Sequence, residues 1–506
     1  MMRKTLLLLA ALGIAWGATA RQTLEEATDS IRQIYARAQA GNPADQNEVG
    51  GWYYRGRHVP QNFQTAAQYW AKAAQSGNAL AIGNLALCYQ TGNGVNAPDS
   101  LRAAGLYLRS IREGNNALFD VQKRAAREGN VFSAALVAQC YADGIGTAKN
   151  LDSAIEYYTI AAEKGSVLSQ RRLGLALFNR RQYERAFEWF GRAADAGDIN
   201  SVFMVGRMYL QGRGTARDAA RGVDFLLRAA REGHANAMLM LAGCYIDGDG
   251  VTRNPSQGIE WLRRAAGKGL AKADWQLAKC EMNGTGTPVN YALATYYFSQ
   301  AIPQNYSGTF TRLITDTIAD SPYVKYLRGR KAYSRHDFDQ AMELFKEVER
   351  TNRAEGQLMQ GVILANSNYS RHNLDKGIKL IRKAAESDPQ AMYILASLHE
   401  QGRGVDQNMP RTVELYTASA NAGYGPAMCA LADMYFEGRG VDQDYTLAVK
   451  YYTEARDSGQ LTPSAAHRLA DCYQHGWGGL QPDADEAKAL NEADFSSHID
   501  TLMQLI

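Results

Sequence analysis

The sequence carries little net charge and, after its first twenty residues, no long hydrophobic run. Its 55 lysines and arginines nearly balance 52 aspartates and glutamates, so the formal charge is +3. Proteins that bind nucleic acid usually carry a strong basic excess, so we expect no nucleic-acid partner. A membrane-spanning helix needs roughly 20 apolar residues in a row. We therefore expect a protein that does not span a membrane, while association with a cell envelope stays open.

The sequence also lacks the short motifs of common hydrolases and metalloenzymes. It contains neither S-x-x-K nor K-T-G, which serine β-lactamases use, and no G-x-S-x-G nucleophile turn. It has neither the H-E-x-x-H pair nor the C-x-x-C spacing that binds zinc. We therefore predict that the protein is not an enzyme and that it has no catalytic residue, no metal and no cofactor.

The first twenty residues have the pattern of a secretory signal peptide. Two basic residues precede an apolar run from Leu6 to Trp16, and Ala18-Thr19-Ala20 offers a small-residue cleavage site before Arg21. The alternative is a membrane anchor, but the run is too short to span the bilayer. We expect an exported protein, either periplasmic or secreted.

Two glycine motifs recur along the chain at nearly constant spacing. Ala-Ala-x-x-Gly ends on glycines that are 36, 32, 36 and 36 residues apart, namely Gly129, Gly165, Gly197, Gly233 and Gly269. Two glycines separated by one residue recur eight times between Gly92 and Gly478. In most copies an Asn or Asp, the preferred helix N-cap, follows four residues later. A period of this length predicts stacked helix-turn-helix units.

The stretch from Ala235 to Gly269 shows one copy in full. An apolar stripe predicts a first helix, and the glycines at 248 and 250 end it. Asn254 followed by Pro255 predicts the start of a second helix, which Gly269 ends. A hairpin of this size cannot bury its own apolar face, so neighbouring copies must cover it.

The array is not uniform along the chain. We predict a signal peptide over 1–20, an N-terminal repeat array over 21–302, an irregular break over 303–322, a C-terminal repeat array over 323–495 and a tail over 496–506. An extra helix is expected over 117–129. The hairpins at 166–197 and 323–350 lack the glycine loop.

Five of the six cysteines occupy one position of the repeat, three residues after an apolar anchor: Cys88, Cys140, Cys244, Cys280 and Cys472. Other copies carry Ala, Met or Leu there, which marks a small core site. Equivalent atoms of stacked helices lie about 8–10 Å apart, beyond the roughly 7 Å that a disulfide allows between Cα atoms. We predict mostly or wholly free, buried thiols. Cys429 lies outside this register, and a disulfide from it stays open.

The string A-x-x-x-L-A-x-C-Y-x-x-G-x-G-V-x-x-N, followed by W-x-x-x-A-A-x-x-G, resembles the Sel-1-like repeat, a relative of the tetratricopeptide repeat. The resemblance covers roughly residues 49–490. It implies an all-α solenoid of stacked helix-turn-helix repeats, used as a scaffold for macromolecular contacts. Some exported members carry a disulfide in each repeat and have been linked to penicillin binding or hydrolysis. This chain departs from that subgroup, because its cysteines occur once per repeat.

Positions that vary between copies are the best candidates for binding, because the fold does not dictate them. In related solenoids the first helices line the concave surface. Two variable positions on those helices would form a cationic and aromatic patch of Arg171, Phe203, Arg207, Trp275 and Lys279, which we predict to bind a partner. The alternative for Phe203 and Trp275 is that they fill gaps between repeats.

We therefore predict an exported repeat scaffold that binds another protein through its concave surface, without catalysis. The alternative is a cell-envelope ligand-binder or hydrolase that acts on peptidoglycan or β-lactams. The absent serine and metal motifs count against that alternative.

Overall fold

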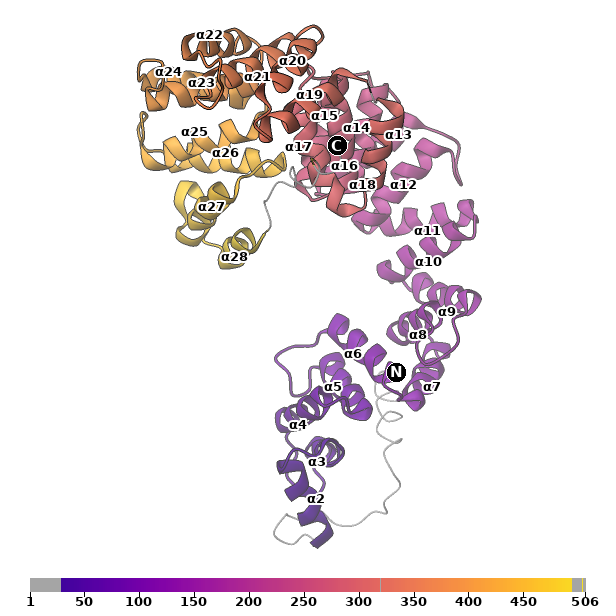
Figure 1. The fold of residues 1–506 in the computed structure, drawn as a ribbon. Coiled ribbons are helices and arrows are strands. Elements are labelled where there is room, and N and C mark those ends of the chain that lie inside the picture. Colours follow the sequence, from indigo (N-terminus) through magenta and orange to yellow (C-terminus); the bar gives the residue numbers. More distant parts are fainter. Residues whose placement is uncertain (1–28, 319, 494–502, 504–506) are drawn as a thin grey trace. The chain divides into compact units, whose positions relative to one another are not determined.

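The computed structural model describes residues 29–318, 320–493 and 503. The predicted signal peptide lies outside the described residues, as does the predicted tail apart from residue 503. Within the described residues the regular structure is helical throughout, and inside each unit most pairs of consecutive helices pack against each other (Figure 1). The predicted all-α solenoid of stacked helix-turn-helix repeats is confirmed.

The chain forms two compact units, and each is described by itself. Unit 1 ends at Met208 and also takes Gly212–Ala216, while unit 2 takes Tyr209–Gln211 and begins again at Arg217. The irregular segment predicted over 303–322 therefore lies inside unit 2.

The helices of unit 1 are α2 (Asp29–Gln39), α3 (Pro43–Arg55), α4 (Phe63–Gln75), α5 (Ala79–Thr91), α6 (Ser100–Arg112), α7 (Asn116–Arg127), α8 (Val131–Asp143), α9 (Leu151–Glu163), α10 (Val167–Asn179), α11 (Tyr183–Asp195) and α12 (Ile199–Gln211), whose last three residues belong to unit 2. Helix α7 is the extra helix that the sequence predicts. The hairpin α10–α11 forms without a glycine loop, as expected.

The helices of unit 2 are α13 (Ala219–Arg231), α14 (Ala235–Asp247), α15 (Pro255–Gly267), α16 (Ala271–Asn283), α17 (Tyr291–Ala301), α18 (Ser307–Arg312), α19 (Pro322–Ser334), α20 (Phe338–Glu349), α21 (Arg353–Ala365), α22 (Leu374–Ala384), α23 (Pro389–Gln401), α24 (Met409–Asn421), α25 (Gly425–Glu437), α26 (Tyr445–Asp457), α27 (Pro463–His475) and α28 (Ala484–Glu492). Short 3-10 turns lie at Ile302–Gln304 and Trp477–Gly479, and a π-helical turn lies at Leu313–Thr317.

The hairpin α14–α15 shows why these residues fold as they do. The Asn254 side chain accepts a hydrogen bond from the Gln257 amide at 3.2 Å, which satisfies one of the free N–H groups at the start of α15. Gly250 takes a φ of 77°, and a Cβ there would overlap the carbonyl oxygen of Ala219 at the start of α13. The second glycine of the loop therefore serves two purposes, because it turns the chain and lets two repeats approach closely.

Unit 2 is more than a linear stack, because α17 also contacts the loop between α26 and α27. The Tyr296 hydroxyl donates to the Gly459 carbonyl at 2.5 Å, and the Gln460 amide donates to the Tyr297 hydroxyl at 3.0 Å. These residues are 163 positions apart in the sequence. These two hydrogen bonds therefore join parts of unit 2 that lie before and after the irregular segment in the sequence. No repeat pattern in the sequence predicts this contact.

Candidate interaction surface

In several repeats the first helix presents one row of side chains that stay at least partly exposed. The row takes the second, fifth and ninth residues of the 13-residue helix, which lie on one side because their spacing is i, i+3, i+7. In α10 these are Leu168, Arg171 and Leu175. In α12 the fifth and ninth residues are Phe203 and Arg207. We call these five residues the α10–α12 face.

Two contacts join α10 to α12 at opposite ends of this face. The Arg171 guanidinium pairs with the Asp198 carboxylate at 3.2 Å. Asp198 in turn accepts from the Ser201 amide at 2.9 Å in the first turn of α12. At the other end the Arg207 guanidinium lies 5.6 Å from the centre of the Phe178 ring of α10. The two arginines are therefore held in place, although each still reaches solvent.

The leucines of this face are exposed. Leu168 has 41% and Leu175 has 48% of its surface accessible to solvent. Among the described residues the large apolar side chains that are exposed all lie in unit 1, and they are Leu80, Leu101, Leu168 and Leu175. Leu80 is the second residue of α5, so three of the four occupy the row just defined. Burying a leucine on a partner contributes about 1.5–3 kcal/mol, which makes this row favourable for binding.

The structure divides the predicted patch between the two units. Arg171, Phe203 and Arg207 lie on the α10–α12 face of unit 1, whereas Trp275 and Lys279 lie on α16 of unit 2. Trp275 is buried, with its ring 4.9 Å from Phe298 and 5.1 Å from Tyr306. Its packing agrees with the gap-filling alternative, while Lys279 is exposed. The role of all five residues in partner binding stays a prediction.

Sequence reasoning missed Leu80 and Leu168. Both are the second residue of a first helix, a position that the comparison of copies did not include. The signal is present in the sequence, because Phe132 fills the same position of α8. Comparing that position across the repeats would have found the apolar row.

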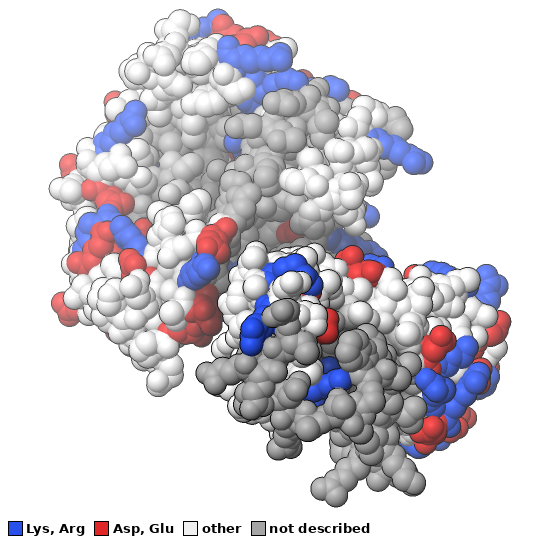
Figure 2. Space-filling view, turned by 90° about the horizontal axis from the view of Figure 1, so that it is seen from below, with Lys and Arg blue, Asp and Glu red and all other residues white. Residues whose placement is uncertain are grey.

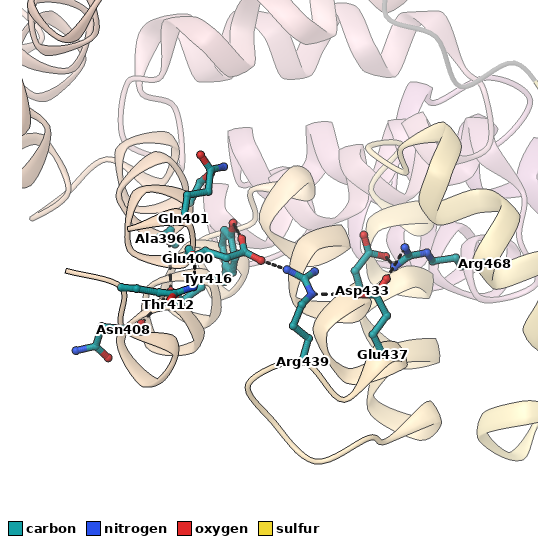
Figure 3. Close-up of polar contacts among 12 residues, drawn as sticks. Ala396, Glu400, Gln401, Asn408, Thr412, Tyr416, Asp433, Glu437, Arg439 and Arg468 are labelled. Carbon is teal, nitrogen blue, oxygen red and sulfur yellow. Dashed lines mark hydrogen bonds and ion pairs between the residues drawn. The ribbon is translucent and has the colours of Figure 1, made fainter. Parts of the chain in front are cut away.

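In the last repeats of unit 2, one position of this row belongs to a network of paired charges (Figure 3). Asp433, the ninth residue of α25, lies 2.9 Å from the Arg468 guanidinium, which also contacts Glu437 at 2.6 Å. Glu437 pairs with Arg439 at 3.0 Å, and Arg439 pairs with Glu400 of α23. We call these five residues the charge ladder. Because its members satisfy each other, a partner would have to displace ion pairs to bind there.

Charges of both signs are interspersed over the molecular face seen in Figure 2, without a broad field of one sign. This agrees with the near balance of charge in the whole sequence. Electrostatic steering over long range is therefore weak, and local contacts must supply specificity.

The described residues offer little reactive chemistry. All six cysteines are free and buried, which confirms the predicted thiols and answers the question left open for Cys429. Burial raises the pKa of the Cys88 thiol to about 12 and that of Cys244 to about 11, so these thiols stay protonated and weakly nucleophilic. The described part of the chain contains no group of three or more His, Cys, Asp or Glu side chains that could hold a metal ion.

The length and hydrophobicity of a helix decide whether it can cross a membrane. No helix among the described residues is both long enough and apolar enough to cross a bilayer.

Comparison with known proteins extends the resemblance over most of the chain. The family model of the Sel1 repeat matches residues 43–78, 79–115, 131–166, 167–198, 199–234, 235–270, 271–306, 354–388, 389–424, 425–460 and 463–490. A putative sel1-like repeat-containing protein L21 of Acanthamoeba polyphaga mimivirus is 31% identical over 91 residues, which are 18% of this chain and 17% of that protein. The chitin synthase regulator SKT5 of Saccharomyces cerevisiae is 28% identical over 213 residues, 39% of this chain and 28% of that protein. The chain thus matches less than a third of the length of either relative.

Two solved structures are similar at lower identity. One is c5321, a protective antigen present in uropathogenic Escherichia coli strains, with 22% identity, coverage of 91% of this chain and 93% of that chain, and a TM-score of 0.38. The other is a Sel1 repeat protein from Oxalobacter formigenes, with 17% identity, coverage of 85% and 99%, and a TM-score of 0.36. The matched repeats extend through both units, and the chain belongs to the Sel1 repeat family.

Proposed function

We propose that this protein is an exported scaffold that binds a protein partner through the α10–α12 face, without catalysis. One observation carries the proposal: Leu168 and Leu175 are exposed on a row that also presents Arg171 and Arg207. Interaction sites combine apolar surface, which supplies affinity, with arginines, which supply orientation. The Sel1 repeat fold is typical of proteins that bind other proteins.

Site-specific photocrosslinking in the native cell tests this face. A photoreactive phenylalanine analogue at position 168 or 175 is expected to give a discrete crosslinked adduct on irradiation. The same analogue at Leu101 is the matched control, because Leu101 is 80% exposed but lies on the second helix α6. The proposal fails if position 101 gives the same adducts as 168 and 175, or if neither of the latter gives any.

Export is supported by the residue pattern of positions 1–20 alone. Mass spectrometry of the mature protein from fractionated cells tests it. We expect a chain that begins at Arg21 in the periplasm or the medium. An intact N-terminus in the cytoplasmic fraction would contradict export and leave the binding face untouched.

The competing function, hydrolysis of β-lactams, is tested with nitrocefin and the purified protein. We expect no turnover. Turnover that a single point mutation abolishes would show that the protein is an enzyme rather than a scaffold.

A further inference from the structure

A surface cavity of about 560 Å³ lies against the hairpin α19–α20 of unit 2; it is open to solvent, and more than half of its lining residues are exposed. Arg328 and Lys331 line it from α19, Arg335 and Asp337 line it from the turn that follows, and Gln340 and Leu344 line it from α20. The Sel1 repeat model does not match this hairpin, because its matches stop at 306 and resume at 354. The repeat pattern therefore does not account for the residues that line the cavity.

The cavity carries an excess of positive charge. The three cations follow an i, i+3, i+7 spacing, so Arg328 and Lys331 project from one side of α19 and Arg335 follows them just past the helix end. None of them makes an ion pair with a residue that the structure describes. The adjacent cation on this helix differs, because Lys325 pairs with Glu347 at 2.9 Å.

The one carboxylate that lines the cavity already has a structural role. Asp337 accepts a hydrogen bond from the Gln340 amide at 3.2 Å and so caps the start of α20. The helix C-terminus explains cations near the end of α19, where Lys331 and Arg335 lie. It does not explain Arg328, which is the seventh residue of 13 in this helix.

We propose that the α19–α20 cavity binds a small molecule that carries two or more phosphate or carboxylate groups. The volume lies in the range of about 300–1,000 Å³ that is typical of small-molecule sites. From Arg328 to Arg335 the helix rises roughly 10 Å, so neighbouring anionic groups of one ligand can each meet a cation. Guanidinium groups bind both phosphate and carboxylate oxygens in pairs.

Isothermal titration calorimetry on the full chain tests the site, at low ionic strength and with EDTA to remove divalent cations. Sodium tripolyphosphate and citrate are the two probes. Saturable one-to-one binding of either probe is expected. Binding of tripolyphosphate alone assigns a phosphate ligand, and binding of citrate alone assigns a carboxylate ligand.

A pair of double variants distinguishes the cavity from general attraction by positive charge. Arg328→Gln with Arg335→Gln is expected to weaken binding at least tenfold. Lys346→Gln with Arg353→Gln removes two exposed cations of the same region that do not line the cavity, and should weaken binding less than threefold. Thermal unfolding of both variants checks that they fold. The proposal is overturned if neither probe binds, or if both double variants weaken binding equally.

Discussion

The ninth residue of the first helix differs between one repeat of unit 1 and one repeat of unit 2. In α10 of unit 1 it is Leu175, which is 48% exposed. In α25 of unit 2 it is Asp433, which pairs with Arg468 and accepts a hydrogen bond from the Tyr452 hydroxyl. The backbone register is the same in both helices. One repeat therefore leaves this position to solvent or a partner, while the other uses it to join neighbouring repeats.

This difference determines where binding is favourable. An exposed leucine loses only water when a partner covers it. The charge ladder must be desolvated on binding, and its existing ion pairs compete with any partner. Membership of the same repeat family thus says little about which repeats bind, because side chains at a few positions decide it.

A fully buried carboxyl group gives unit 2 a second distinction. Glu355 of α21 accepts hydrogen bonds from the amides of Tyr291 at 2.7 Å and Ala292 at 2.6 Å, at the start of α17. It also accepts from the Asn352 side chain at 2.8 Å. Glu355 therefore links α21 to α17, which lie on opposite sides of the irregular segment in the sequence. Unit 2 depends on a polar contact in its interior, whereas the predicted binding row of unit 1 is on the surface.

Removing this contact should have the largest effect on stability. Glu355→Ala removes the acceptor of three N–H donors, and we expect unit 2 to lose about 3–5 kcal/mol of unfolding free energy. The buried thiols measure each unit separately, because Cys88 and Cys140 lie in unit 1 and Cys244 and Cys472 lie in unit 2. Pulsed alkylation along a urea gradient should show earlier reaction of the unit 2 thiols alone. If the unit 1 thiols react earlier by the same amount, the two units unfold together.

The pH dependence should differ between the units in the same way. Burial raises the pKa of Glu355 to about 8 and that of Asp388 to about 6, against the opposing effects of hydrogen-bonded amides and, for Glu355, of Arg330. The folded state then binds more protons than the unfolded state above about pH 4. Stability from these groups is fully present below that pH and is lost as the pH rises toward 8.

The urea midpoint of unit 2 is therefore expected to decrease as the pH rises from 5 to 8. Thiol labelling along a urea gradient at each pH measures this midpoint. Asp274, with a pKa that burial raises to about 7, acts in the same direction. A midpoint for unit 2 that rises over this range would show that these carboxyls are ionised in the folded state.

Repeats are local, which explains how much the sequence predicts. Asn254, Pro255 and the glycines each act within a few residues of their own position, so helix ends follow from spacing alone. Gly250 shows the limit, because its second purpose depends on Ala219 of the preceding repeat. For Trp275 the sequence leaves burial and partner binding open, since Tyr306 of the irregular segment supplies one of its contacts. No periodic pattern places that segment.

A smaller effect is expected from the charge ladder. Arg468→Met removes the contacts to Asp433 and Glu437 and should lower the stability of unit 2 by about 1–2 kcal/mol, because Asp433 keeps only its tyrosine donor. Added salt should reduce the difference from wild type. Arg411→Met is the matched control, since its pair with Glu414 is exposed and should contribute less than about 0.5 kcal/mol. Equal losses from the two variants would show that the ladder adds nothing beyond an ordinary surface pair.

The smallest effect on stability should come from the α10–α12 face itself. Leu168→Ser with Leu175→Ser changes two side chains that the fold leaves exposed. The free energy of unfolding of unit 1, followed by its thiols along a urea gradient, should therefore change by less than about 0.5 kcal/mol. Arg172 is an exposed neighbour on α10, and the photoreactive analogue at this position is expected to give crosslinked adducts in the wild-type background. The double variant should lose these adducts. Loss of binding without loss of stability is what separates a binding row from a packing row. A large drop in stability would instead show that these leucines support unit 1, and the contrast with the charge ladder would then disappear.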